Sequence, residues 1–142
     1  MKNGLFYELE QIGLVAADAK AMAKNYEEIL GIGPWNFLEF KLSPDEEQKT
    51  VIASGKIKDV ELEIIEPHSD KVIHTKFLED NGPGLHHLLF RCDDMDKASA
   101  YLIEKGLEVL EDIKLGSVRW MYFDGRELFG AIIEVHDMGD LA

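Results

Sequence analysis

The chain of 142 residues has a single cysteine, Cys92, and few basic residues, with 15 lysines and arginines against 28 aspartates and glutamates. One cysteine excludes a disulfide within the chain and is typical of a reducing compartment, so we expect a cytoplasmic protein in which Cys92 packs as a small hydrophobe. The formal net charge of -13 repels nucleic acid and anionic lipid, which are therefore not expected as partners.

Long apolar runs are also missing. No run approaches the ~18 residues that a membrane-spanning helix needs, and the start of the chain lacks the apolar core of a signal peptide. We therefore expect no membrane partner. The length predicts a single domain over residues 1–142, long enough to bury about two-thirds of its unfolded surface.

An internal repeat divides the chain into two similar halves. The segment from Gln11 to Asp18 aligns with the segment from His87 to Asp94 without a gap, at a shift of 76 residues. Each segment reads as a strand that ends in an aspartate and is followed by apolar residues at helical spacing. Asp18 and Asp94 are therefore predicted to cap two helices by accepting hydrogen bonds from the first N–H groups.

Both halves read as the same order of elements. The first half, 8–66, predicts a helix at 19–30 and strands at 8–17, 35–41, 49–57 and 59–66. The second half, 85–137, predicts a helix at 95–105 and strands at 85–92, 107–114, 117–124 and 130–137. Between them lies a polar linker at 67–84 with a short helical stretch around 72–79. We expect an α+β fold in which two tandem βαβββ modules form a cupped mixed sheet around a cleft.

Four polar residues interrupt apolar strands, two in each half: Gln11, Glu63, His87 and Glu134. Taken singly none is specific, since a glutamate near a strand end is usually solvated and a buried histidine usually bonds a backbone carbonyl. Matched positions in a duplicated module favour a shared role. We predict that they hold one divalent metal ion in the cleft. One imidazole, one amide oxygen and two carboxylates suit Zn, Ni, Co, Mn or Mg, without selecting among them.

A family resemblance appears at residues 77–90, which read FLEDNGPGLHHLLF. From Gln11 to His136 the chain resembles the vicinal oxygen chelate superfamily, which includes glyoxalase I and methylmalonyl-CoA epimerase. The resemblance implies paired βαβββ modules around a metal cleft and a homodimer. It also implies that the second histidine of the pair, His87, is the ligand, whereas His86 points to the opposite face with a structural role.

Two departures from the epimerase pattern are visible. Gln11 stands where epimerases usually have a histidine and where some glyoxalase I enzymes have a glutamine. Residues 123–130 differ from the turn that epimerases usually have there. The substrate contacts of the epimerases are therefore not expected to carry over to this chain. A set with one histidine also differs from the two-histidine iron triad of the ring-cleaving dioxygenases.

The resemblance and the donors together predict a metal-dependent isomerase, epimerase or isomerising lyase. It would act on a small carbonyl or thioester substrate by proton abstraction through a metal-stabilised enolate, with Glu134 and Glu63 as the catalytic residues. The alternative is a metal-free protein of the same fold that sequesters a small molecule. A third possibility is a structural dimerisation module, but such a module would not explain why two glutamates lie in an apolar cleft.

The remaining histidines and arginines receive weaker assignments. His68 and His74 lie in the polar linker and are expected to be solvated, and His136 shares a strand face with Glu134. Arg119 and Arg126 are expected at the surface, although either arginine could hold an anionic substrate tail.

Overall fold

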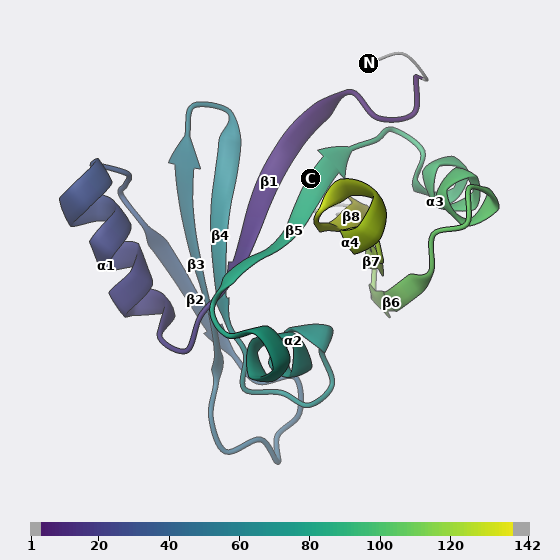
Figure 1. Ribbon diagram of the computed structural model, residues 1–142. Helices are drawn as coiled ribbons and strands as arrows, with labels where there is room; N and C mark the ends of the chain where they lie inside the picture. The colour runs from purple at the N-terminus through teal and green to yellow at the C-terminus, as the bar shows by residue number, and fades with distance from the viewer. Residues whose placement is uncertain (1–3, 138–142) are drawn as a thin grey trace. The chain divides into compact units, whose positions relative to one another are not determined.

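The computed structural model of the protein describes residues 4–137 (Figure 1). The chain divides into two compact units, one made of Gln11–His86 and the other of Met1–Glu10 with His87–Ala142. We call these the first and the second unit, after the predicted module that each contains. The boundaries fall inside the strands β1 (Glu8–Val15) and β5 (Gly84–Arg91).

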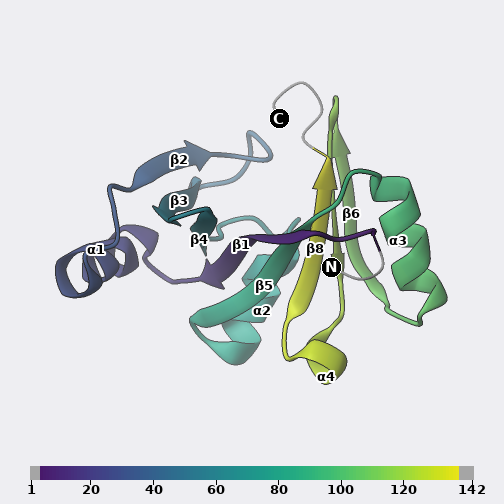
Figure 2. The ribbon, with the colours of Figure 1, turned by 90° about the horizontal axis from the view of Figure 1, so that it is seen from above.

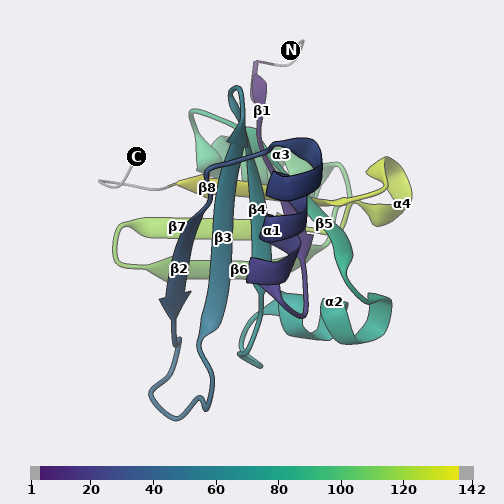
Figure 3. The same ribbon diagram turned by 90° about the vertical axis from the view of Figure 1, so that its left-hand side faces the viewer.

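The first unit is a four-stranded sheet with a helix on one face. After β1 come α1 (Ala19–Leu30), β2 (Asn36–Phe40), β3 (Thr50–Ile57), β4 (Val60–Glu66) and α2 (Ile73–Asn81). The strand order is β2-β3-β4-β1, antiparallel from β2 to β4 and parallel between β4 and β1. α1 packs against β3 and β4 (Figure 3).

Alternation along β4 sorts its side chains between the two faces of this sheet. Leu62 and Ile64 belong to the apolar core that includes Ala19 and Ala23 of α1. The two glutamates at 61 and 63 therefore lie on the opposite face, away from the helix. The alternation of apolar and polar residues along β4 thus places these two acidic side chains next to each other on the face opposite the helix.

The second unit repeats this arrangement. β5 is followed by α3 (Met95–Glu104), β6 (Val109–Leu115), β7 (Val118–Phe123), α4 (Arg126–Phe129) and β8 (Ile132–Asp137). The order is β5-β8-β7-β6, parallel between β5 and β8 and antiparallel from β8 to β6. α3 lies along this sheet (Figure 2), and Ala98 of α3 shares a core with Ile133 and Val135 of β8.

The strand registers of the two units are equivalent. In the first unit Gly13 of β1 is paired with Glu63 of β4. In the second unit Leu89 of β5 is paired with Glu134 of β8. Each predicted donor of the first strand, Gln11 or His87, therefore lies two residues before the partner of a glutamate and shares its face of the sheet.

The α+β class and the two βαβββ modules are confirmed, and so are the two helix caps. The carboxylate of Asp18 accepts a hydrogen bond from the N–H of Ala21 at 3.0 Å, and that of Asp94 accepts one from Lys97 at 3.0 Å. Of the described helices, none is long and apolar enough to cross a membrane. The single domain over residues 1–142 and the module limits stay predictions.

One element was not expected from the sequence. The one-turn helix α4 lies between the strands predicted at 117–124 and 130–137, in an interval for which no element was predicted. Four residues are too few to show helical periodicity. The turn is stabilised by Asp124, which accepts hydrogen bonds from the backbone and the side chain of Arg126.

The N-cap bond of α3 gives a test of the fold. Asp94→Ala should lower the free energy of unfolding by about 1 kcal/mol, because it leaves an N–H group of the first turn without its acceptor. Urea denaturation measures the change. Asp70→Ala, at an exposed turn position, is the control and should change stability much less. Equal effects of the two substitutions would contradict the capping role.

Candidate metal centre

His87 and Glu134 form a close pair inside the second unit. Both are buried, with 0% and 7% of their surface exposed. They are close together because they lie on neighbouring strands on the same face of the sheet. The Nε2 atom of His87 is 3.0 Å from the Oε2 atom of Glu134. The ring of Tyr122, a residue paired with Glu134 across β7 and β8, packs edge-on against the imidazole at 5.2 Å between centroids.

The geometry of this pair fits two ligands of one ion. Glu134 Oε2 is buried and makes no hydrogen bond to any atom of residues 4–137, although His87 Nε2 is close. The distance between the two atoms is that of a hydrogen bond, but the angles at the two atoms do not meet the requirements of one. Two ligand atoms held about 2.1 Å from one ion at a right angle are about 3.0 Å apart. An imidazole nitrogen and a carboxylate oxygen are also common donors for Zn and other divalent metals.

Gln11 lies between two glutamates inside the first unit. It is 8% exposed, and its amide nitrogen Nε2 donates to Glu61 Oε1 at 2.7 Å and to Glu63 Oε2 at 3.3 Å. Both glutamates are half-buried on the same face of β4. The amide carries its oxygen and nitrogen on one carbon, so rotation of the group presents Oε1, the atom that binds a cation. Amide and carboxylate oxygens are the donors that hard divalent ions prefer.

Each unit thus brings its own predicted donors together. Gln11 and Glu63 approach within 3.3 Å in the first unit, and His87 and Glu134 within 3.0 Å in the second. That all four bind one ion remains a prediction. Sequence reasoning missed Glu61, whose only signal was its position two residues before Glu63 on the same strand face.

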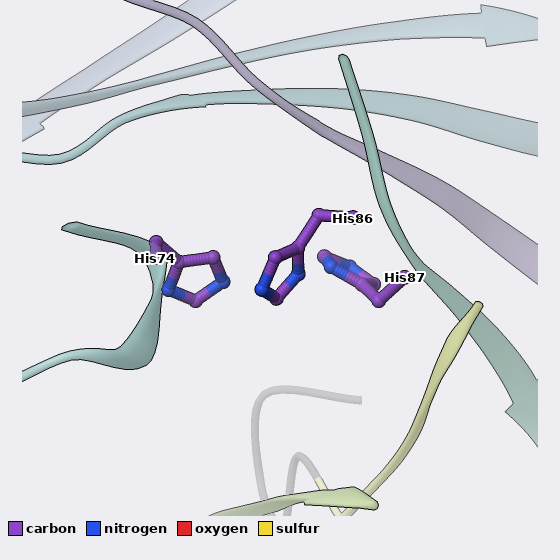
Figure 4. A group of neighbouring side chains, drawn as sticks. All are labelled: His74, His86 and His87. Carbon is purple, nitrogen blue, oxygen red and sulfur yellow. The ribbon is translucent and has the colours of Figure 1, made fainter. Parts of the chain in front are cut away.

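Two further histidines surround the start of β5. His74, His86 and His87 are all buried, and their candidate ligand atoms lie within 4.8 Å of one another (Figure 4). His74 and His86 approach at 4.4 Å between ring centroids, with a tilt of 35°. The ring of Phe77 meets His86 edge-on at 4.7 Å. Three imidazoles in one place are a second donor set for a transition metal.

The expectation that His74 is solvated was wrong. It is 5% exposed, because α2 turns the face that carries His74 and Phe77, three residues apart, toward His86. The sequence does not reveal this face, because polar residues surround it and the segment therefore reads as a polar linker. His68 is not fully solvated either, since it is half-buried with Nε2 2.7 Å from Glu66 Oε2.

A cavity of about 300 Å³ lies within the second unit. His136 lines it and is paired with Glu10, with 3.3 Å between His136 Nε2 and Glu10 Oε2. Cys92 also lines it and packs against the core of this unit. Burial, and then the carboxylate of Asp93, raise the pKa of the Cys92 thiol. The thiol is therefore protonated at neutral pH and is a poor nucleophile or metal ligand.

Arg119 and Arg126 are each held by an aspartate. Arg119 makes two hydrogen bonds to Asp112, at 2.9 and 2.8 Å. Arg126 makes two to Asp124, and these bonds lower the pKa of Asp124 to about 2. Both arginines are thus paired as expected of surface residues, and an anionic substrate would have to compete with these carboxylates.

Comparisons with known proteins agree on the fold. A family model described as the Glyoxalase/Bleomycin resistance protein/Dioxygenase superfamily matches residues 10–122. The uncharacterized protein YqjC of Bacillus subtilis (strain 168) is 29% identical over an alignment of 131 residues that covers 89% of this chain and 89% of that protein. Methylmalonyl-CoA epimerase from Mycobacterium tuberculosis has a TM-score of 0.71 at 18% identity, over 99% of this chain and 94% of that one.

Two further solved structures are similar over nearly the whole chain. A methylmalonyl-CoA epimerase with selenomethionine has a TM-score of 0.64 at 27% identity, over 96% of this chain and 98% of that one. A Streptomyces coelicolor methylmalonyl-CoA epimerase variant in complex with 2-nitronate-propionyl-CoA has a TM-score of 0.71 at 23% identity, over 92% and 94%. At these identities the likeness supports the fold more strongly than the reaction.

Single substitutions separate the two donor sets. His87→Ala should abolish binding of a divalent ion, because it removes the only nitrogen ligand of the predicted site, whereas His86→Ala and His74→Ala should retain the ion. Elemental analysis of each purified variant, after incubation with Zn²⁺ and desalting, measures the metal content. Loss of metal in all three variants would assign the ion to the three-histidine cluster instead.

Proposed function

The chain belongs to the glyoxalase/bleomycin resistance protein/dioxygenase superfamily, and we propose that it is a metal-dependent isomerase or isomerising lyase. Its reaction moves a proton at the carbon next to a carbonyl or thioester group. The observation that carries the proposal is the buried pair of His87 Nε2 and Glu134 Oε2, 3.0 Å apart without a hydrogen bond to satisfy the carboxylate oxygen. A buried carboxylate of this kind is costly unless a cation or a proton compensates it.

Four residues would hold the ion in this proposal: Gln11, Glu63, His87 and Glu134. A bound divalent ion supplies a Lewis acid that polarises the substrate carbonyl and stabilises the negative charge of the enolate. The donor set does not select one metal among Zn, Ni, Co, Mn and Mg.

The two glutamates move the proton in the proposed reaction. A carboxylate has two oxygens, so Glu134 would bind the ion through Oε2 and accept the proton of the substrate carbon through Oε1. Burial around Glu134 excludes water, which would otherwise compete for the proton. Glu63 lies on the equivalent strand of the other unit and starts the cycle protonated. It donates its own proton, to the same carbon in an epimerase or to the neighbouring carbon in an isomerising lyase, so Glu134 ends protonated and Glu63 ends ionised until both exchange protons with solvent.

Substrate candidates come from two chemical classes. The epimerase neighbours, one of them in complex with 2-nitronate-propionyl-CoA, support a 2-methyl-branched acyl-CoA thioester. Gln11 in the donor set supports a 2-oxoaldehyde adduct of the kind that glyoxalase I enzymes use.

A homodimer is also proposed. β2 stands at the end of the strand order of its sheet, and its residues Phe37 and Leu38 are 47% and 59% exposed. An edge strand with apolar side chains leaves backbone groups and apolar surface that a second copy can cover. Sedimentation at micromolar concentration should show a dimer, and a monomer alone would contradict the proposal.

Replacement of Glu134 tests the mechanism. Glu134→Gln keeps an oxygen donor and removes the base, so metal should stay largely bound while turnover falls by about 10²–10⁴-fold. Glu63→Gln tests the second proton transfer in the same way. Exchange of the substrate hydrogen in D₂O, followed by NMR for both candidate classes, measures the reaction, and the exposed Glu47→Gln serves as the control. Full exchange activity in both site variants would rule out the two-glutamate mechanism.

A further inference from the structure

The amide of Gln11 has an unequal pair of acceptors. Its nitrogen is 2.7 Å from Glu61 Oε1 and 3.3 Å from Glu63 Oε2. The shorter distance is typical of a hydrogen bond to a charged acceptor, and the longer one is beyond the usual range for N–H to oxygen. Glu61 is therefore the main partner of the amide, and Glu63 is a weak second partner.

The strand register explains why Glu61 reaches this position. Gln11 of β1 is directly paired with Glu61 of the parallel strand β4. Paired residues of neighbouring strands lie side by side on the same face. The contact is thus a consequence of the strand register, which places the side chain of Glu61 beside that of Gln11.

The second unit has no such carboxylate at the equivalent position. There the first-strand donor His87 is paired with Ile132 of β8. The imidazole of His87 and the amide of Gln11 differ in whether they must be oriented to bind a cation. An imidazole presents a nitrogen on either side of its ring, whereas an amide presents either an oxygen, which binds cations, or a nitrogen, which repels them. An acceptor beside the amide removes this ambiguity.

We propose that Glu61 is a positioning residue for Gln11. By accepting the hydrogen bond from Nε2 it holds the nitrogen on its own side and leaves Oε1 as the atom that faces a cation. Glu63, whose contact with the amide is the longer one at 3.3 Å, would serve as a separate metal ligand. The inference rests on the proposed function, because it assigns Glu61 a task in building that metal site.

Electrostatics favour the same pairing. A glutamate at position 11 would add a third carboxylate beside Glu61 and Glu63, whose like charges would repel it. A glutamine is neutral and donates to them instead. Gln11 and Glu61 therefore form one unit of the site, in which a neutral amide donates to the carboxylate that orients it.

A double-mutant cycle tests this role without any substrate. Metal-free protein is titrated with Co²⁺ alone, and the visible absorption of the bound ion gives the dissociation constant. Glu61→Ala should weaken binding about 10- to 100-fold, the usual effect of removing a group that orients a ligand. In the Gln11→Ala background the same substitution should change binding by no more than about twofold, because the oriented group is absent.

Two matched variants separate orientation from charge and from folding. Glu61→Gln keeps the volume and an acceptor oxygen, so its affinity should stay within about threefold of the wild type. Glu47→Ala removes one exposed carboxylate and should leave affinity unchanged. Circular dichroism of each variant confirms that the fold is retained.

Each other result has a distinct meaning. Undiminished affinity of Glu61→Ala, or the same loss with and without Gln11, would overturn the positioning role while leaving the metal site in place. Equal losses in Glu61→Ala and Glu61→Gln would show that the charge matters and not the hydrogen bond, which also overturns it. A wild-type protein that binds no Co²⁺ would refute the proposed function, and the inference with it.

Discussion

Parallel pairing between the first and the last strand of each unit is the constraint on which the candidate site depends. Gly13 opposite Glu63 and Leu89 opposite Glu134 fix the register. A slip of one residue would turn each side chain of the strand to the opposite face, so the polar donors would meet the helix-covered face, where apolar residues form the cores. The apolar cores thus hold the polar donors in place, since any change of register would bury charge against a helix.

The two units satisfy their buried polar groups differently. In the first, the amide of Gln11 donates to two carboxylates, so the cost of burying it is largely offset by hydrogen bonds. In the second, His87 and Glu134 lie within 3.0 Å, yet the carboxylate oxygen gains no hydrogen bond. Of these buried groups, the carboxylate of Glu134 is thus the one whose burial is offset least by hydrogen bonds, which is why the proposal of a metal rests on this pair.

Duplication supplies a common frame, and single residues then give each half its own chemistry. Position 61 is a glutamate where the equivalent position of the second unit, 132, is an isoleucine. The linker adds His74, which α2 brings against His86 on the strand beside the predicted ligand. An equivalent of this buried imidazole pair is not found in the first-half repeat of the sequence, where Glu10 precedes Gln11.

The sequence by itself determined the elements of both modules and singled out four candidate donors, whose binding of a metal stays a prediction. Alternation and helical spacing are local properties of the chain, and the matched positions of Gln11 and His87 are visible because the halves align. Only the tertiary structure decided which neighbours these donors have. The bond between Gln11 and Glu61 depends on the register of two strands 50 residues apart, and the burial of His74 depends on where α2 packs. Both are long-range contacts, which no pattern of neighbouring residues encodes.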